Sequence, residues 1–283
     1  MRACYGRADK CVLRKKRMNV PDVLVINVDS RTDRWASIER NWKNSGIFPH
    51  LKRFSAYISK QRHRGPSLSH ILAVLEYFKN NTASDMILVM EDDALPMHDI
   101  KTWNNSFTAL HSGLSSSIQW KVVVLSPLLS PGIVQVRKHE SNDAMSHIVM
   151  GTNLSAALVL YHRRIVPFLN KWRGYYQTDR SRYAFGIDRL LARLSTNEHL
   201  IATQPLAEQD TSSRSNNPGA FSQRLCKMAQ QQSHFILERL QLSRETEASA
   251  FNAVYFSVDS VNMLLLLAQI LFAVIISSSF LRI

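Results

Sequence analysis

The sequence predicts an α/β protein with one large domain, and two observations lead to this class. Two almost continuously apolar runs, 23–28 and 86–90, are typical of strands buried on both faces of a sheet. Segments with helical apolar spacing lie between such runs, and this alternation favours an α/β fold. A chain of 283 residues with 45% hydrophobic and 20% charged residues also excludes a disordered tail, a collagen-like fibre and a small disulfide scaffold.

The first predicted unit is a strand, a polar loop and a helix. Residues 23–28 form the strand and residues 29–34 form the loop. An apolar stripe at helical spacing then predicts the helix: Trp35, Ile38 and Trp42. Gly46 is expected to end this helix. A strand, a polar loop and a helix in this order are the opening of an α/β nucleotide-binding unit.

The second predicted helix covers 67–80, with Ser67 as its N-cap. The strand 86–90 follows and ends directly in Glu91, Asp92 and Asp93. Three acids after a buried strand place negative charge at the carboxyl edge of the sheet, where α/β proteins bind ligands. Further strands are expected at 120–125 and 154–161, and further helices at 163–172 and 186–195.

The two ends of the chain differ from the domain between them. Residues 1–20 form a basic, flexible leader that carries +6 of the net charge of +13. Residues 21–220 are expected to be the catalytic domain, and residues 221–255 a polar helical stalk. Residues 258–281 are a candidate transmembrane helix, because no charged residue occurs from 260 to 281.

The sequence therefore favours a membrane protein with a single-pass C-terminal anchor and a cytosolic catalytic domain. The alternative for residues 258–281 is a helix docked in a groove of the domain. The positive charge favours anionic partners. A nucleic-acid partner is not expected, because the chain shows no reading helix, RNP-like aromatic residues or zinc spacing. Three cysteines, two of them in the leader, indicate neither a disulfide framework nor a zinc site.

The acidic triplet is the strongest candidate for a functional site. Carboxylates are the hard oxygen ligands that Mg²⁺ and Mn²⁺ prefer, and such an ion can neutralise a departing diphosphate. On an extended segment Glu91 and Asp93 point the same way, and Asp92 faces the opposite side. Glu91 and Asp93 are therefore the candidate metal ligands. The alternative is a solvated turn with helix-capping acids.

Two further motifs carry candidate binding residues. Arg31 and Arg34 lie at a strand end and a helix start, where guanidinium groups and the helix N-terminus favour phosphate. A simple Asp33–Arg34 capping pair is the alternative for that loop. Ser69 and His70 lie near the start of the second helix, where a lone histidine is usually structural.

Taken together, three segments in this order, 25–34, 68–71 and 88–94, resemble the family 25 glycosyltransferases. That family includes lipooligosaccharide galactosyltransferases and collagen hydroxylysine galactosyltransferases. The similarity spans about 22–215 and is weaker after Ala94, where the segments 151–157, 185–188 and 204–209 look like later motifs of the family. The chain departs from the family pattern at Asp29 and at Pro66.

The resemblance implies a GT-A-type, Rossmann-like mixed sheet flanked by helices. It also implies an inverting hexosyltransferase that moves galactose or glucose from a UDP-sugar to the hydroxyl of a glycan, a lipid-linked sugar or a protein, with Mn²⁺ or Mg²⁺ as cofactor. Glu91, Asp92 and Asp93 match the family's metal and diphosphate motif. The implied donor-binding residues are Asn27, Arg31, Arg34, Ser69, His70 and Asp92.

An inverting transfer needs a base that deprotonates the acceptor hydroxyl. Asp188 is the candidate for this catalytic role, and a helix N-cap is the alternative. Asp179 and Asp210 are weaker candidates. A second hypothesis for the whole chain is a non-catalytic relative that keeps the fold and binds a nucleotide or glycan at a membrane.

Overall fold

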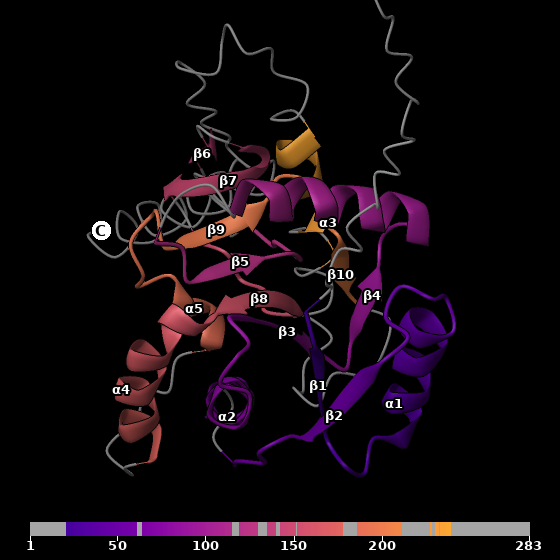
Figure 1. The fold of residues 1–283 in the computed structure, drawn as a ribbon, viewed down its shortest axis with the longest axis vertical. Helices are drawn as coiled ribbons and strands as arrows, with labels where there is room; N and C mark the ends of the chain where they lie inside the picture. Colours follow the sequence, from indigo (N-terminus) through magenta and orange to yellow (C-terminus); the bar gives the residue numbers. More distant parts are fainter. Residues whose placement is uncertain are drawn as a thin grey trace, which may run out of the picture.

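The computed structural model describes residues 21–60, 64–114, 119–129, 135–139, 142–150, 152–177 and 186–210, together with 227, 230, 231 and 233–238. Its centre is an eight-stranded sheet flanked by helices on both faces (Figure 1). In sheet order the strands are β2 (Leu51–Ser55), β1 (Val23–Asn27), β3 (Met86–Glu91), β8 (Leu158–His162), β5 (Val122–Val124), β9 (His199–Ala202), β7 (Asn142–Met150) and β6 (Gln135–His139). The predicted α/β class with a mixed sheet is confirmed.

Parallel pairing in one half of the sheet creates the edge at which ligands bind in α/β proteins. β1 pairs in parallel with both β2 and β3, and β5 pairs in parallel with β9. The antiparallel strand β8 separates these two parallel groups. The carboxyl ends of β1 and β3 therefore lie side by side, and the acidic triplet follows directly from one of them.

Side chains alternate between the two faces of the strands and divide the core into two layers. Leu24 and Ile26 of β1 pack with the cluster that contains residues of α2 (Arg64–Asn80), α4 (Val166–Gln177) and α5 (Ile187–Leu191). Val23 and Val25 pack on the other face, with α3 (Ile100–Leu114) and the pair α1 (Thr32–Ile38) and η1 (Glu39–Lys43), a π-helix. Both faces of these strands are buried, which explains their continuously apolar sequence.

Several predicted boundaries are wrong in an informative way. The second helix begins at Arg64, so Ser67 is a fully buried residue inside it and not its N-cap. Residues 154–157 lie outside β8, and the helix expected from 186 to 195 is the short α5. The helix expected from 163 starts as a 3₁₀ turn (Arg163–Ile165) and continues as α4. Gly46 does terminate the first helical segment, with a φ of 81° that favours glycine.

Four parts of the fold were not predicted from the sequence. β2 lies at the edge of the sheet, and β6 and β7 form a hairpin at the other edge. α3 packs its apolar stripe under the sheet: Trp103, Phe107, Leu110 and Leu114. The strands β4 (Ala94–Pro96) and β10 (Ala207–Gln209) form a separate antiparallel pair. This pair brings Gln209 next to the acidic triplet.

The predicted leader, 1–20, and the candidate transmembrane helix, 258–281, lie outside the described residues. In the part of the chain that the structure describes, no helix is long and apolar enough to span a membrane. The residues of the predicted stalk that the structure describes contact the domain: Leu237 is fully buried, and the Ser233 hydroxyl accepts a 2.6 Å hydrogen bond from the Leu129 amide.

His199, the first residue of β9, should make the fold acid-sensitive. Its Nε2 atom is buried without a hydrogen-bond partner, and burial lowers the pKa of the ring to about 4. The unfolded chain has the ordinary histidine pKa of about 6.5, so the stability due to the neutral ring is complete above that pH and is lost as pH falls towards 4. At about 1.4 kcal/mol per pKa unit, the loss is at most about 3 kcal/mol.

We expect His199→Phe to remove this component. Urea unfolding of the wild type and the variant at pH 7.5 and pH 4.5 measures it, and the wild type should lose more stability than the variant. The exposed His50→Phe is the matched control and should behave as the wild type. An equal pH dependence for wild type and His199→Phe would contradict the assignment.

Candidate functional site

A cleft of about 480 Å³ opens at the carboxyl ends of β1 and β3. Its walls are the end of β1, the segment after β2, the start of α2, the acidic triplet and Gln209. Six of the predicted site residues line it: Arg34, Ser69, His70, Glu91, Asp92 and Asp93. The topology thus gathers three motifs, separated by up to sixty residues of sequence, into one concave site.

Asp92 joins the first strand and the first helix to the triplet. Its Oδ2 accepts a 2.7 Å hydrogen bond from Asn27 Nδ2, and its Oδ1 forms a 2.6 Å ion pair with Arg34. Asn27 is fully buried, and the Asp92 and Arg34 side chains are 9% and 10% exposed. Both carboxylate oxygens are therefore engaged in a buried, charge-assisted network. Asp92 therefore has a structural role: it connects the end of β1 and the first helix to the acidic triplet.

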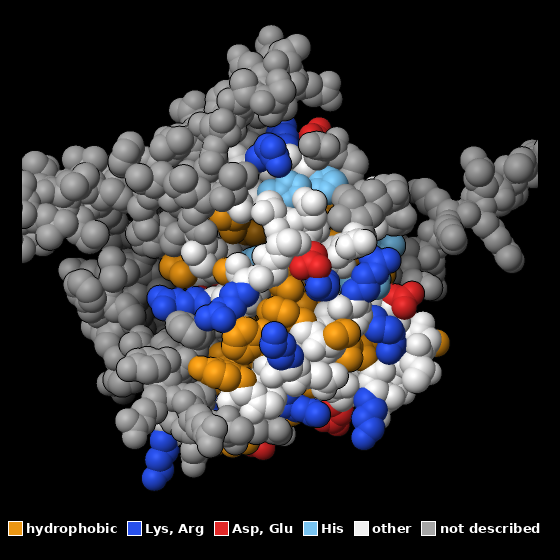
Figure 2. Space-filling view, turned by 90° about the vertical axis from the view of Figure 1, so that its left-hand side faces the viewer, with side chains coloured by type: hydrophobic (Ala, Val, Ile, Leu, Met, Phe, Trp, Pro, Cys, Tyr) orange, Lys and Arg blue, Asp and Glu red, His pale blue; other side chains and the backbone are white. Residues whose placement is uncertain are grey.

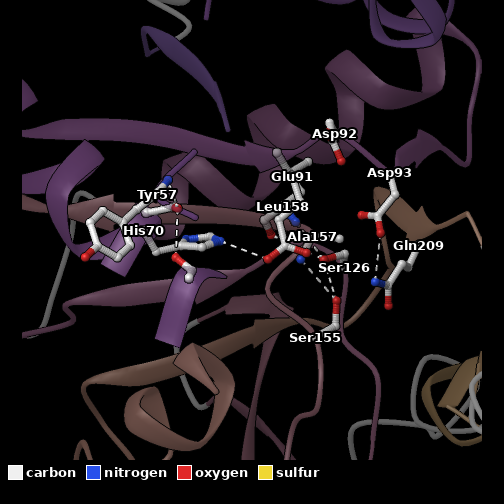
Figure 3. A network of polar contacts seen from close by, with 12 residues as sticks. Tyr57, His70, Glu91, Asp92, Asp93, Ser126, Ser155, Ala157, Leu158 and Gln209 are labelled. Carbon is white, nitrogen blue, oxygen red and sulfur yellow. Dashed lines mark hydrogen bonds and ion pairs between the residues drawn. The ribbon is translucent and has the colours of Figure 1, made fainter. Parts of the chain in front are cut away.

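Glu91 points to the other side, towards His70 (Figure 3). His70 Nε2 lies 3.2 Å from Glu91 Oε1, and His70 Nδ1 lies 3.0 Å from the Tyr161 hydroxyl. A carboxylate only accepts, so Nε2 carries the proton and donates to Glu91, and Nδ1 accepts from Tyr161. Burial, and then the charge of Glu91, raise the pKa of Tyr161, which keeps the hydroxyl protonated as a donor.

Asp93 has the least satisfied carboxylate of the three. Its Oδ2 accepts a 3.0 Å hydrogen bond from Gln209 and lies 3.8 Å from Arg34, whereas its buried Oδ1 has no hydrogen-bond partner. Burial raises the pKa of Asp93 to about 7, and the charge of Glu91 adds to the rise. The Gln209 hydrogen bond and the Arg34 charge act in the opposite direction. A buried carboxylate oxygen without a partner fits either a proton or a cation.

The residues present fit a metal ion that takes some of its ligands from a bound substrate or water. In the described part of the chain they do not provide a complete set of protein ligands. Among the described residues, no group of three or more His, Cys, Asp or Glu side chains is arranged to hold a metal ion. Glu91 and Asp93 offer at most two carboxylates, with the orphaned Asp93 oxygen as the clearest free ligand atom. Such an ion would need further oxygen ligands from water or from a phosphate.

Ser69 shapes the rim of the cleft. Its hydroxyl donates to the Gly65 carbonyl at 2.8 Å and accepts from the Tyr57 amide at 2.8 Å, so it holds residues 56–60 against α2. Gly65 is required at this contact, because a Cβ there would lie 2.8 Å from the Tyr57 carbonyl oxygen. The predicted role of Ser69 in donor binding is therefore indirect in this geometry: the residue positions the segment that forms one wall.

Three predicted site residues are not part of the cleft lining: Asn27, which hydrogen-bonds Asp92, and also Arg31 and Asp188. Arg31 pairs with Asp33 through two contacts of 2.9 and 2.7 Å, and its carbonyl accepts from Asn27. Asp188 lies in the first turn of α5 behind the N-cap Gly186, so it is not the N-cap itself. Burial raises the pKa of Asp188, and the charge of Glu91 contributes to the rise, so the two carboxylates sense each other.

The two weaker candidates for the general base are Asp179 and Asp210. Asp179 lies outside the described residues. The Asp210 amide donates to the Asp93 carbonyl at 2.6 Å, which continues the β4–β10 pairing beside the triplet. Sequence reasoning missed Gln209 and Tyr161 as site residues. Gln209 lies in the segment 204–209 that resembles a family motif, whereas Tyr161 ends an apolar strand and gives no sequence signal.

No protein-family model matches the sequence, and no curated protein matches it. Among solved structures, the chain is similar to a glycosyltransferase involved in the glycosylation of the major capsid of PBCV-1, with a TM-score of 0.45 and 6% identity over 77% of this chain and 100% of that one. It is also similar to the inositol-1-phosphate CTP transferase from T. maritima, with a TM-score of 0.37 and 11% identity over 74% and 77% of the two chains.

A third similar structure is the glycosyltransferase GlyE of Streptococcus pneumoniae TIGR4, with a TM-score of 0.34 and 8% identity over 84% of this chain and 66% of that one. All three TM-scores lie below 0.5. The function of this chain is therefore argued from its own residues and their geometry.

The Arg34–Asp92 ion pair should be essential for stability. Arg34→Gln leaves Asp92 buried without its cation, and breaking a buried pair in this way costs about 3–5 kcal/mol. The matched control is Lys43→Gln, which breaks the exposed 3.3 Å pair with Glu39 and should cost about 0.5 kcal/mol or less. Urea unfolding measures both variants. Equal losses for the two would show that Asp92 does not depend on Arg34.

Tyr161→Phe should allow His70 to populate a second neutral tautomer. Without the hydroxyl donor, Nδ1 no longer has a partner that favours its unprotonated form, so a second neutral tautomer becomes populated. Long-range ¹H–¹⁵N NMR correlations of the His70 ring measure the two forms. Tyr77→Phe is the control, because that hydroxyl bonds Asp22 and Ser84 away from His70. A single, unchanged His70 tautomer in Tyr161→Phe would refute this assignment.

Proposed function

We propose that the protein is a metal-dependent glycosyltransferase that moves a hexose, galactose or glucose, from a UDP-hexose to a hydroxyl acceptor with inversion. The observation that supports it best is the acidic triplet at the carboxyl edge of two parallel strands, with one buried Asp93 oxygen that has no partner. A bound Mn²⁺ or Mg²⁺ would supply Lewis-acid stabilisation of the departing diphosphate. Glu91 and Asp93 are the residues that would hold it.

The cleft suits a nucleotide-sugar in size and in chemistry. Its volume of about 480 Å³ lies within the usual range for small-molecule sites. Tyr57 and Ile58, 45% and 75% exposed, give one wall an apolar surface, and Lys60 adds a positive charge to it. Together with Arg34, Lys60 provides cationic groups near the position where a diphosphate would meet the triplet.

In the proposed reaction the acceptor hydroxyl oxygen attacks C1 of the hexose from the face opposite the leaving group. The new C1–O bond forms as the bond from C1 to the diphosphate oxygen breaks, and the leaving group keeps that electron pair. Asp188 is the candidate that takes the hydroxyl proton, and its raised pKa suits a general base better than an ordinary aspartate. The acceptor is a glycan, a lipid-linked sugar or a protein hydroxyl.

The choice of sugar and of inversion rests on the resemblance of segments 25–34, 68–71 and 88–94 to the family 25 glycosyltransferases. All three segments contribute residues to the lining of the cleft, and the first provides Arg34. A GT-A-type arrangement is part of the same proposal.

Release of UDP from a panel of UDP-sugars by the full chain tests the proposal. We expect one UDP-hexose to be hydrolysed in the presence of Mn²⁺ or Mg²⁺, with no release in EDTA. Asp93→Asn should reduce the rate at least about 100-fold, because it removes the charge that holds the ion. The exposed Asp85→Asn is the matched control and should keep the wild-type rate.

Binding of UDP, measured by calorimetry with and without metal, separates the remaining outcomes. UDP binding without turnover of any donor, in the presence of candidate acceptors, would favour a non-catalytic nucleotide-binding relative. No turnover and no UDP binding would overturn the proposal.

A further inference from the structure

A second cavity, distinct from the cleft, lies between α4 and the residues that follow α5. Its volume is about 260 Å³, and its lining residues are Lys171, Trp172, Tyr175 and Arg193. None of these residues lines the candidate active site. Two aromatic rings and two cations are an unusual combination for a surface depression, and nothing in the proposed catalytic chemistry requires it.

The sequence of α4 creates this surface. Leu169 and Tyr176 of α4 are fully buried in the core cluster that also contains residues of α2. The adjoining flank carries Trp172, which is partly buried, and Tyr175, which is 42% exposed. The helix has a core-facing stripe and a neighbouring aromatic stripe, so its aromatic residues extend beyond what core packing uses.

The rings of Trp172 and Tyr175 are nearly perpendicular and form an aromatic corner. The Trp172 and Tyr175 rings are 5.5 Å apart between centroids, with an interplanar angle of 78°. The guanidinium carbon of Arg193 lies 4.9 Å from the centroid of the Trp172 ring, a cation–π contact that fixes the charge next to the aromatic surface. A flat base that needs two parallel rings does not fit this corner, whereas a puckered ring with C–H groups on its faces does.

The positive charge around this cavity favours an anionic ligand. Residues 163–177 contain Arg163, Arg164, Lys171 and Arg173 and no Asp or Glu. Figure 2, which faces the side of the molecule that carries α4 and α5, shows Lys and Arg side chains gathered around hydrophobic ones. An anionic group between Lys171 and Arg193 would form charge-assisted hydrogen bonds beside the aromatic corner.

We propose that this cavity binds an acidic sugar unit, with its ring against Trp172 and Tyr175 and its carboxylate, sulfate or phosphate group on Lys171 and Arg193. The choice of a sugar among anionic ligands rests on the proposed function, since an acceptor glycan would need a binding surface beyond the cleft. α5 connects the cavity to the candidate base, because Asp188 lies in its first turn and Arg193 follows its end.

Calorimetric titration of the full chain with a heparin-derived tetrasaccharide and with tetragalacturonate tests this proposal, with maltotetraose as the neutral probe. We expect saturable binding of at least one acidic tetrasaccharide and none of maltotetraose. The double variant Lys171→Gln/Arg193→Gln should raise the Kd at least about 10-fold, since each lost charge-assisted contact is worth about that factor. Tyr175→Ala should also weaken binding.

The matched control is Arg173→Gln, because Arg173 is an exposed cation of the same helix that does not line the cavity. Arg173→Gln should leave the Kd within about twofold, because its contribution is screened, long-range attraction. An equal loss in Arg173→Gln and in the double variant would overturn the proposal, because it would indicate a general polyelectrolyte effect. Circular dichroism confirms that each variant is folded.

Two further results of the titration would overturn the proposal: no saturable binding of either acidic tetrasaccharide, or equal binding of maltotetraose. A third would come from a binding assay with phosphatidylserine vesicles: if the chain binds these vesicles and neither tetrasaccharide, and the double variant abolishes the binding, the proposal is overturned. The titration contains no nucleotide-sugar, so its outcome does not depend on turnover. UDP release by the same preparation reports separately on the proposed function, and the two proposals can fail independently.

Discussion

The buried ion pair between Arg34 and Asp92 is the interaction on which the site depends. It connects the first helix to the end of β3, and the Asn27 amide adds the end of β1 through the same carboxylate. Backbone pairing and apolar packing also join these three elements, but neither fixes the direction of a side chain. The network therefore sets the orientation of the whole acidic triplet.

Once Asp92 is tied to the first strand and helix, its neighbours must find other partners. Glu91 meets an imidazole N–H that is itself fixed by Tyr161, and Asp93 meets the neutral amide of Gln209. Three consecutive acids thus have three different electrostatic environments. Alternation along an extended segment predicted that Asp92 would separate from its neighbours, and the turn at residues 92–93 adds the divergence of Glu91 and Asp93.

The fold class could be predicted because the central strands are apolar on both faces, and only a doubly covered sheet needs that pattern. β2 was missed because it is an edge strand with exposed Lys52 and Arg53, so its sequence lacks the apolar run. α3 could have been predicted, since Trp103, Phe107, Leu110 and Leu114 recur at helical spacing. Residue types and strand ends gave the acidic site, but Gln209 and Tyr161 reach it only through tertiary pairing.

The charge balance of the cleft supports the proposal that a nucleotide-sugar donor binds together with a cation. Only Asp92 has a full cation in contact at short range, so the wall retains negative charge at Glu91 and Asp93. The carboxylates would repel a diphosphate that binds without a cation, and burial strengthens this repulsion, whereas Arg34 and Lys60 of the same cleft would attract the diphosphate. Burial, and then the charge of Glu91, raise the pKa of Asp93, so the ionised form of this carboxylate is disfavoured on the same wall. A divalent ion held by Glu91 and Asp93 would reduce the repulsion of a diphosphate and would favour the ionised form of Asp93, whose buried oxygen without a hydrogen-bond partner is a free ligand atom.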